Sequence, residues 1–193
     1  MPLVTSPIDF DAIRLAFVDA LMGATGLGQN SVVQMQAEQP VAKRPELPFA
    51  TFQLTGLAQP YGQDQSAYAN VLSPDVWVYS GPRMLTASFQ FYGRTHEEAY
   101  GLAVAWQAAL GQDPTRDVLA LGGLTIWRRQ PAVDISGLMM TGYEGRASVT
   151  ATFGVQSQSF VNVGTIAEVP VDGFVVAGQA TDELVFTATL AKD

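Results

Sequence analysis

Residues 144–155, EGRASVTATFGV, alternate between apolar and polar side chains more regularly than any other stretch of the chain. Successive side chains of a β-strand point to opposite faces of its sheet, so this period of two predicts a half-buried strand. One face carries the apolar set: Ala147, Val149, Ala151, Phe153 and Val155. The other face carries the polar set: Arg146, Ser148, Thr150 and Thr152. The stretch therefore predicts a sheet that is covered on one face.

Upstream segments extend this sheet. Residues 50–55 alternate in the same way, and residues 75–79 and 84–92 predict a hairpin that turns at Ser80-Gly81-Pro82. Shorter strands are expected at residues 31–36 and 124–128. Residues 59–74 are mostly polar and predict a long loop, which is unusual within a compact domain.

Three helices are expected around these strands. The first begins after the N-cap Asp9, buries Phe10, Ile13, Phe17 and Leu21, and ends at Gly23 and Gly26. The second opens with a capping box formed by Thr95 and Glu98, and its core stripe is Ala99, Leu102, Ala103, Trp106 and Leu110. The third begins at Asp113-Pro114 and ends at Gly122-Gly123.

The second helix also predicts a contact outside its own core. Its remaining faces carry Gly101, Val104, Ala105 and Ala108 where an isolated surface helix would carry charges. We therefore expect it to pack on the sheet on one side and against something further on another.

The order of elements is helix, strands, helix, short helix, strands. This order predicts the α+β class, with a mainly antiparallel or mixed sheet and two or three helices packed on one face. The tail has strand-like runs at 164–171, 174–176 and 184–190. We expect one domain over residues 1–173, with an inserted loop at 60–74, and a C-terminal β extension at 174–193.

Composition limits the classes of function. Of 193 residues, 48% are hydrophobic and 15% are charged, where about 25% charged residues is usual. So little charge suggests that partners cover part of the surface. The net charge of −8 argues against general nucleic-acid binding. The chain has no cysteine, so we expect neither thiol chemistry nor a disulfide. It shows no signal segment and no run of 18 apolar residues, so we expect a soluble protein that does not span a membrane.

A search for catalytic groups yields no site. His96 is the only histidine, and it falls in the first turn of the second helix. Glu97 and Glu98 are adjacent on that helix and therefore diverge, and Asp9 and Asp11 are explained as helix-start acids. The glycine-rich residues 23–28 follow a helix and precede a strand, which is the reverse of the order in a phosphate-binding loop. We expect no catalytic, cofactor-binding or metal-binding residue.

Two other groups of side chains suggest contacts with macromolecules. The basic pairs Lys43-Arg44 and Arg128-Arg129, the second beside Trp127, could bind phosphate and stack on a base, although two arginines at a strand end are more often interface residues. Several aromatic residues lie on or beside strands: Trp77, Tyr79, Phe91, Tyr92 and Tyr143. Some of them are expected to be core, but their number favours assembly as the activity.

Six segments stand out in order along the chain: DFDAIRLAFVDALMGATG, RPELPFATFQLTG, MLTASFQFYG, EEAYGLAVAWQAAL, YEGRASVTATFG and VGTIAEVPVDG. Their most telling pieces are Phe91-Tyr92-Gly93, Tyr143-Glu144-Gly145-Arg146 and Val163-Gly164-Thr165-Ile166. In order and spacing, over residues 8–173, the segments resemble the neck/tail terminator proteins of tailed bacteriophages, in the family with a gp-twelve-like neck terminator domain. The loop at 60–74 and the residues beyond Gly173 depart from that pattern.

The resemblance implies a non-catalytic α+β subunit of the virion, made in the host bacterial cytoplasm. It implies a homo-hexameric ring at the head-proximal end of the tail, which caps the tail tube and contacts the head–tail connector, and the sheath if the tail is contractile. A ring needs two different contact surfaces on each subunit. The small-residue side of the second helix and a sheet edge are the candidates, and an acidic bore would let DNA slide. A head-side stopper or connector, a tube-like subunit and a nucleic-acid-binding module remain alternatives.

Overall fold

The computed structural model describes residues 8–35, 44–61, 65–70, 73–139 and 142–162. The chain divides into two compact units: Met1–Ser66 with Tyr79–Ser159, and Ala67–Val78 with Phe160–Asp193. The larger unit contains the helices and the packed part of the sheet. The domain boundary expected at residue 173 stays a prediction, and residues 163–193, with their expected strands, lie outside the described part.

The three expected helices form where the sequence places them. Helix α1 spans Phe10–Thr25, and the side chain of Asp9 accepts hydrogen bonds from the backbone N–H groups of Asp11 and Ala12. Helix α2 spans His96–Ala109 behind the N-cap Thr95, and α3 spans Asp113–Leu121 with proline in its first turn. Gly23 lies inside α1, so Gly26 alone ends this helix, in the left-handed conformation (φ 71°).

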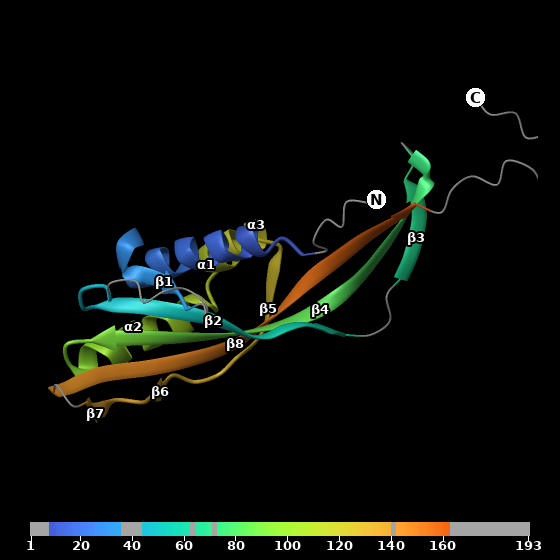
Figure 1. Ribbon diagram of the computed structural model, residues 1–193. Coiled ribbons are helices and arrows are strands. Elements are labelled where there is room, and N and C mark those ends of the chain that lie inside the picture. The colour runs from blue at the N-terminus through green and yellow to red at the C-terminus, as the bar shows by residue number, and fades with distance from the viewer. Residues whose placement is uncertain (1–7, 36–43, 62–64, 71–72, 140–141, 163–193) are drawn as a thin grey trace, which may run out of the picture. The chain divides into compact units, whose positions relative to one another are not determined.

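The strands form a mixed sheet in the order β1-β2-β4-β8-β5 (Figure 1). Its members are β1 (Val32–Gln34), β2 (Phe49–Pro60), β4 (Ser73–Gly93), β8 (Gly142–Asn162) and β5 (Leu124–Arg129). A short 3-10 turn, η1 (Gln29–Ser31), precedes β1. Strand β1 runs parallel to β2, whereas the β2–β4 and β5–β8 pairs are antiparallel. The expected α+β class with helices on a mixed sheet is confirmed.

Three short strands lie beside the central order. Strand β3 (Gln65–Asn70) pairs with β4, and β6 (Val133–Asp134) and β7 (Gly137–Met139) both pair with β8. Residues 124–139 thus follow β8 along one edge, first as β5, then as β6, then as β7.

Two expectations about the middle of the chain are wrong. The polar loop expected at 60–74 is largely strand, because β2 continues to Pro60, β3 follows, and β4 begins at Ser73. The hairpin expected at Ser80-Gly81-Pro82 is absent, since β4 runs straight through these residues. Strand β2 pairs with β4 as far as Arg83, and Tyr61, just after β2, donates its backbone N–H to the Pro82 carbonyl at 3.1 Å. Pairing with the neighbouring segment overrides the local turn preference of Gly-Pro.

The core lies between the helices and one face of the sheet. The Phe17 ring of α1 packs against Phe52, Phe89 and Phe153, with ring centroids 5.6, 5.3 and 5.1 Å away. Trp106 of α2 reaches the same Phe89 at 4.9 Å, so α1 and α2 cover the same face. Helix α1 also contacts α3 alongside it (Figure 1). The alternation of β8 is confirmed on this face, where Ala147, Val149, Ala151, Phe153 and Val155 are all buried.

Candidate functional site

The only histidine lies at the rim of the sheet. His96, the first residue of α2, places Nδ1 3.2 Å from a carboxylate oxygen of Asp134 on β6, and Tyr100 stacks on its ring. Hydrogen bonds from the side chain and backbone of Ser136 lower the pKa of Asp134, and His96 lowers it further. Both partners are half exposed. The pair therefore links the start of α2 to β6, and sequence reasoning missed Asp134 as the partner.

The other acidic candidates serve helix starts, as expected. Thr95 Oγ1 accepts the backbone N–H of Glu98 at 3.2 Å, and Glu98 Oε2 accepts the backbone N–H of Arg94 at 2.7 Å. Asp11 forms an ion pair with Arg14 at 2.8 Å. Within the described residues, no group of three or more histidine, aspartate or glutamate side chains could hold a metal ion. No described helix is long and apolar enough to cross a membrane.

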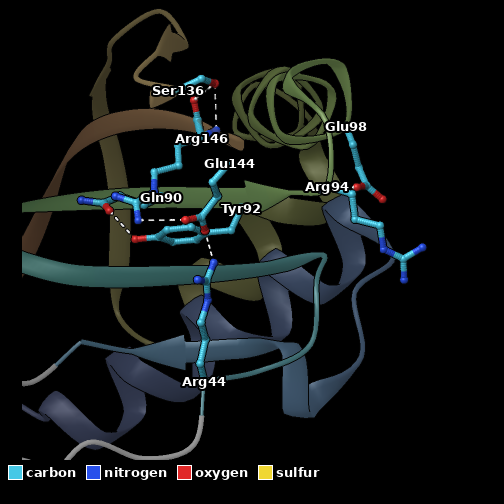
Figure 2. A network of polar contacts seen from close by, with 8 residues as sticks. All are labelled: Arg44, Gln90, Tyr92, Arg94, Glu98, Ser136, Glu144 and Arg146. Carbon is cyan, nitrogen blue, oxygen red and sulfur yellow. Dashed lines mark hydrogen bonds and ion pairs between the residues drawn. The ribbon is translucent and has the colours of Figure 1, made fainter. Parts of the chain in front are cut away.

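One basic candidate belongs to a cluster on the sheet face opposite the helices (Figure 2). We call Arg44, Phe49, Tyr92, Glu144 and Arg146 the Glu144 cluster. The carboxylate of Glu144 is buried, and it accepts one hydrogen bond from Arg44 and another, at 3.1 Å, from Arg146. The Tyr92 ring stacks on Phe49 at 4.4 Å, and both guanidinium groups lie over it, at 5.8 and 5.1 Å. The hydrogen bond and ring contacts of Arg44 are therefore with residues of its own chain. Its neighbour Lys43 lies outside the described residues.

Two glycines next to this cluster let the sheet approach α2 closely. A Cβ on Gly93 would lie 2.6 Å from the backbone nitrogen of Ala99, and one on Gly145 would collide with the Thr95 carbonyl. Strands β4 and β8 therefore meet the start of α2 at one junction. Around it lie two of the sequence pieces that carry the family resemblance, Phe91-Tyr92-Gly93 and Tyr143-Glu144-Gly145-Arg146. Their glycines pack against the helix, while Tyr92, Glu144 and Arg146 form the cluster.

The other basic pair separates in space. Arg129 donates to the Gln107 carbonyl of α2 at 3.1 Å and packs over Gly111, so it serves the fold. Arg128 is exposed, and a bulge in the β5–β8 ladder lies between it and Ile126. Trp127 packs over Gly154, and its ring meets that of Tyr61 at 4.8 Å. A hollow of about 490 Å³ adjoins Trp127.

The exposed aromatic residues differ from those expected. Phe91 is in the core and Tyr92 is 8% exposed, whereas the side chains of Trp77 and Tyr143 lie outside the described ones. Larger exposed fractions belong to Tyr61, Tyr100 and Trp127, at 62%, 38% and 41%. No sequence pattern singled out Tyr61, because it falls in the segment that was expected to be a loop.

Two different surfaces remain available for contacts with other molecules. On α2, Gly101, Val104 and Ala108 are exposed, so the uncharged face expected from the sequence is open in this chain. At the end of the sheet order, β5 has β8 on one side and pairs with no described strand on the other. We call this second side the β5 edge.

Comparison with known proteins agrees with an assembly role. Residues 11–178 match the sequence model of the family described as phage neck terminator protein. No curated protein matches the chain. This family is structural and belongs to the tail and neck of the phage particle, where its members contact other neck and tail proteins. Since the match covers most of the chain, this protein belongs to the phage neck terminator protein family.

Proposed function

We propose that copies of this chain form a closed, homo-hexameric ring at the head-proximal end of a phage tail, where the ring stops growth of the tail tube and joins it to the head–tail connector. Family membership carries this proposal. A ring uses head-to-tail contacts, so each subunit needs two unlike surfaces. The exposed α2 face and the β5 edge supply such a pair. In a contractile tail the sheath would be a further partner.

The proposed role requires no bond-breaking chemistry. His96 and Asp134 link two elements, Asp9 and Glu98 accept hydrogen bonds from backbone N–H groups at helix starts, and Glu144 is neutralised by arginines. We infer that the protein acts by binding alone, in the virion, after synthesis in the host bacterial cytoplasm.

The ring would also form part of the channel through which the genome passes. A subunit with a formal net charge of −8 gives a strongly acidic ring. Acidic groups on the bore would repel DNA phosphates and let the genome slide. A ring structure whose bore is lined by Arg128, Arg129 and Arg146 would contradict this part of the proposal.

Tail assembly without the protein tests the main proposal. If the chain terminates the tube, phage lacking it should produce tail tubes of uncontrolled length, visible by electron microscopy. Normal-length tails without heads would instead assign it to the head-side stopper or connector. Light scattering on the purified protein measures the ring directly, and tight DNA binding with a steep salt dependence would favour the nucleic-acid alternative.

A further inference from the structure

The β5 edge lies beside a groove that suits an added strand. This groove, of about 320 Å³, is lined by α3 on one side and by Leu124, Thr125 and Ile126 of β5 on the other. An extended segment can join the exposed edge of a sheet through main-chain hydrogen bonds while its side chains fill neighbouring pockets. The opposite end of the sheet order offers less, because β1 has only three residues.

The apolar and charged groups of this region indicate what could bind. Ile126 is half-buried in the groove, and Leu121, at the end of α3, is 86% exposed. The charged groups that line the groove are Asp113, Arg116 and Asp117 on α3, and Asp113 is paired with Arg116 at 3.5 Å. Beyond the groove, Arg128 near the end of β5 is exposed. An extended segment with apolar side chains, and with an acidic residue at the end that meets Arg128, would complement this edge.

The C-terminal part of this chain has that composition. Residues 163–193 carry five acidic residues and one lysine, or −4 of the total −8. Within them, residues 182–190, DELVFTATL, begin with two acids and continue with an apolar alternation. If this segment runs antiparallel to β5, Asp182 and Glu183 lie at the end of the strand that carries Arg128. The family match stops at residue 178, so this segment lies beyond it.

We propose that residues 182–190 of one copy bind along the β5 edge of the next copy, as an added strand between β5 and α3. The inference rests on the proposed ring, because it supplies the donor and the acceptor of one head-to-tail contact. Residues 163–181 separate Asn162 from this segment, and at about 3.3 Å per extended residue they can span about 60 Å. The ring is then held by an exchanged strand as well as by packed surfaces.

Charge reversal in the full-length chain tests the contact. Two variants are made separately: Arg128→Glu, and the double variant Asp182→Lys with Glu183→Lys. Each variant places like charges together at every contact, so each should weaken ring association about tenfold. Light scattering over a range of protein concentrations measures the association. Mixing the two variants pairs each altered edge with a complementary segment, so mixed rings should regain wild-type association. Two controls lie outside the contact and should leave association unchanged: Arg94→Glu, which is matched in charge to Arg128→Glu, and Asp193→Lys, which also adds positive charge to the C-terminal residues.

Disulfide trapping gives a second readout, because the chain has no cysteine of its own. A Thr125→Cys chain mixed with a Phe186→Cys chain should yield an oxidised heterodimer, whereas Leu15→Cys on α1 with Phe186→Cys should not. Unchanged ring association in both charge variants, or a Thr125→Cys and Phe186→Cys mixture that yields no oxidised heterodimer, would overturn the inference without contradicting the proposed ring. A wild-type chain that stays monomeric in solution and on tail tubes would contradict the proposed ring itself.

Discussion

The two faces of the sheet belong to the same strands but are stabilised by different interactions. On the helix-covered face, Phe17, Phe89 and Phe153 pack edge to face and are fully buried. On the opposite face, uncharged polar side chains such as Ser88 and Thr150 are half-buried, and the Glu144 cluster occupies one end. One face stabilises the chain by removing apolar area from water, and the other holds its geometry through hydrogen bonds and ion pairs.

This difference teaches where changes should affect folding and where they should affect contacts. Side chains on the helix-covered face are surrounded by this chain alone, so their replacement leaves a cavity. Most side chains on the other face and at the β5 edge retain exposed surface, so replacing them changes what a neighbouring molecule meets. Substitutions on the covered face should therefore destabilise the fold more than substitutions on the other face do.

Removing the central ring of the covered face should have the largest effect. Phe89→Ala deletes a side chain that contacts both Phe17 and Trp106, and it should lower the free energy of unfolding by about 3–5 kcal/mol. Urea denaturation measures the change. The neighbouring Ser88→Ala, on the other face, should stay within about 0.5 kcal/mol, and equal losses for both variants would contradict the division between the faces.

Adding a methyl group where the sheet meets α2 should be the next largest change. A Cβ on Gly145 collides with the Thr95 carbonyl, so Gly145→Ala should lower the free energy of unfolding by about 1–3 kcal/mol. Gly137→Ala is the matched control, because nothing lies within 4 Å of its added Cβ. Thermal unfolding that leaves both variants equally stable would show that the junction tolerates extra volume.

Neutralising the carboxylate of the Glu144 cluster should have an intermediate effect. Glu144→Gln leaves Arg44 and Arg146 without a charged acceptor, and it should cost about 1–2 kcal/mol, because Arg44 is half exposed and screened by water. Glu46→Gln, at an exposed position, should leave the free energy of unfolding unchanged in the same denaturation assay. A silent Glu144→Gln would mean that stacking of Tyr92 on Phe49 holds this end of the sheet without the ion pairs.

The smallest effect concerns the rim residue Asp134, whose pKa lies below its ordinary value of 3.8. A lowered pKa in the folded state gives stability that is present above the ordinary pKa and is lost as the pH falls through the lowered one. An NMR titration should therefore place the midpoint of this carboxyl below 3.8. Ser136→Ala should raise the midpoint more than His96→Gln does, because Ser136 is the larger cause; the reverse order would contradict this assignment.

Local sequence signals predicted the helices well. The caps Asp9 and Thr95 and the C-cap Gly26 act on neighbouring backbone groups, so their effect is readable from a few residues. The resemblance to neck and tail terminator proteins was likewise readable, and the family match confirms it. The contacts that build the Glu144 cluster were not readable, because Arg44 and Glu144 are 100 positions apart.

The errors fall where distant strands decide the conformation. Ser80-Gly81-Pro82 is a good local turn signal, yet β4 continues through these residues, where Tyr61 after β2 bonds the Pro82 carbonyl. The same pairing converts most of the expected loop at 60–74 into strand. The sequence left open which of the aromatic residues are core, and the register with Ala50 and Phe49 places Phe91 in the core and Tyr92 in the cluster.

By itself, the sequence determined the helix boundaries, the covered face of β8 and the class of fold, because caps and periodicity act over a few neighbouring residues. Only the tertiary structure decided that β4 is one strand, that Gly93 and Gly145 meet α2, and that Arg128 is exposed beside an edge that pairs with no described strand while Arg129 is held against α2. These features depend on strand order and register. Both are set by contacts between residues far apart in the chain, which no local pattern encodes.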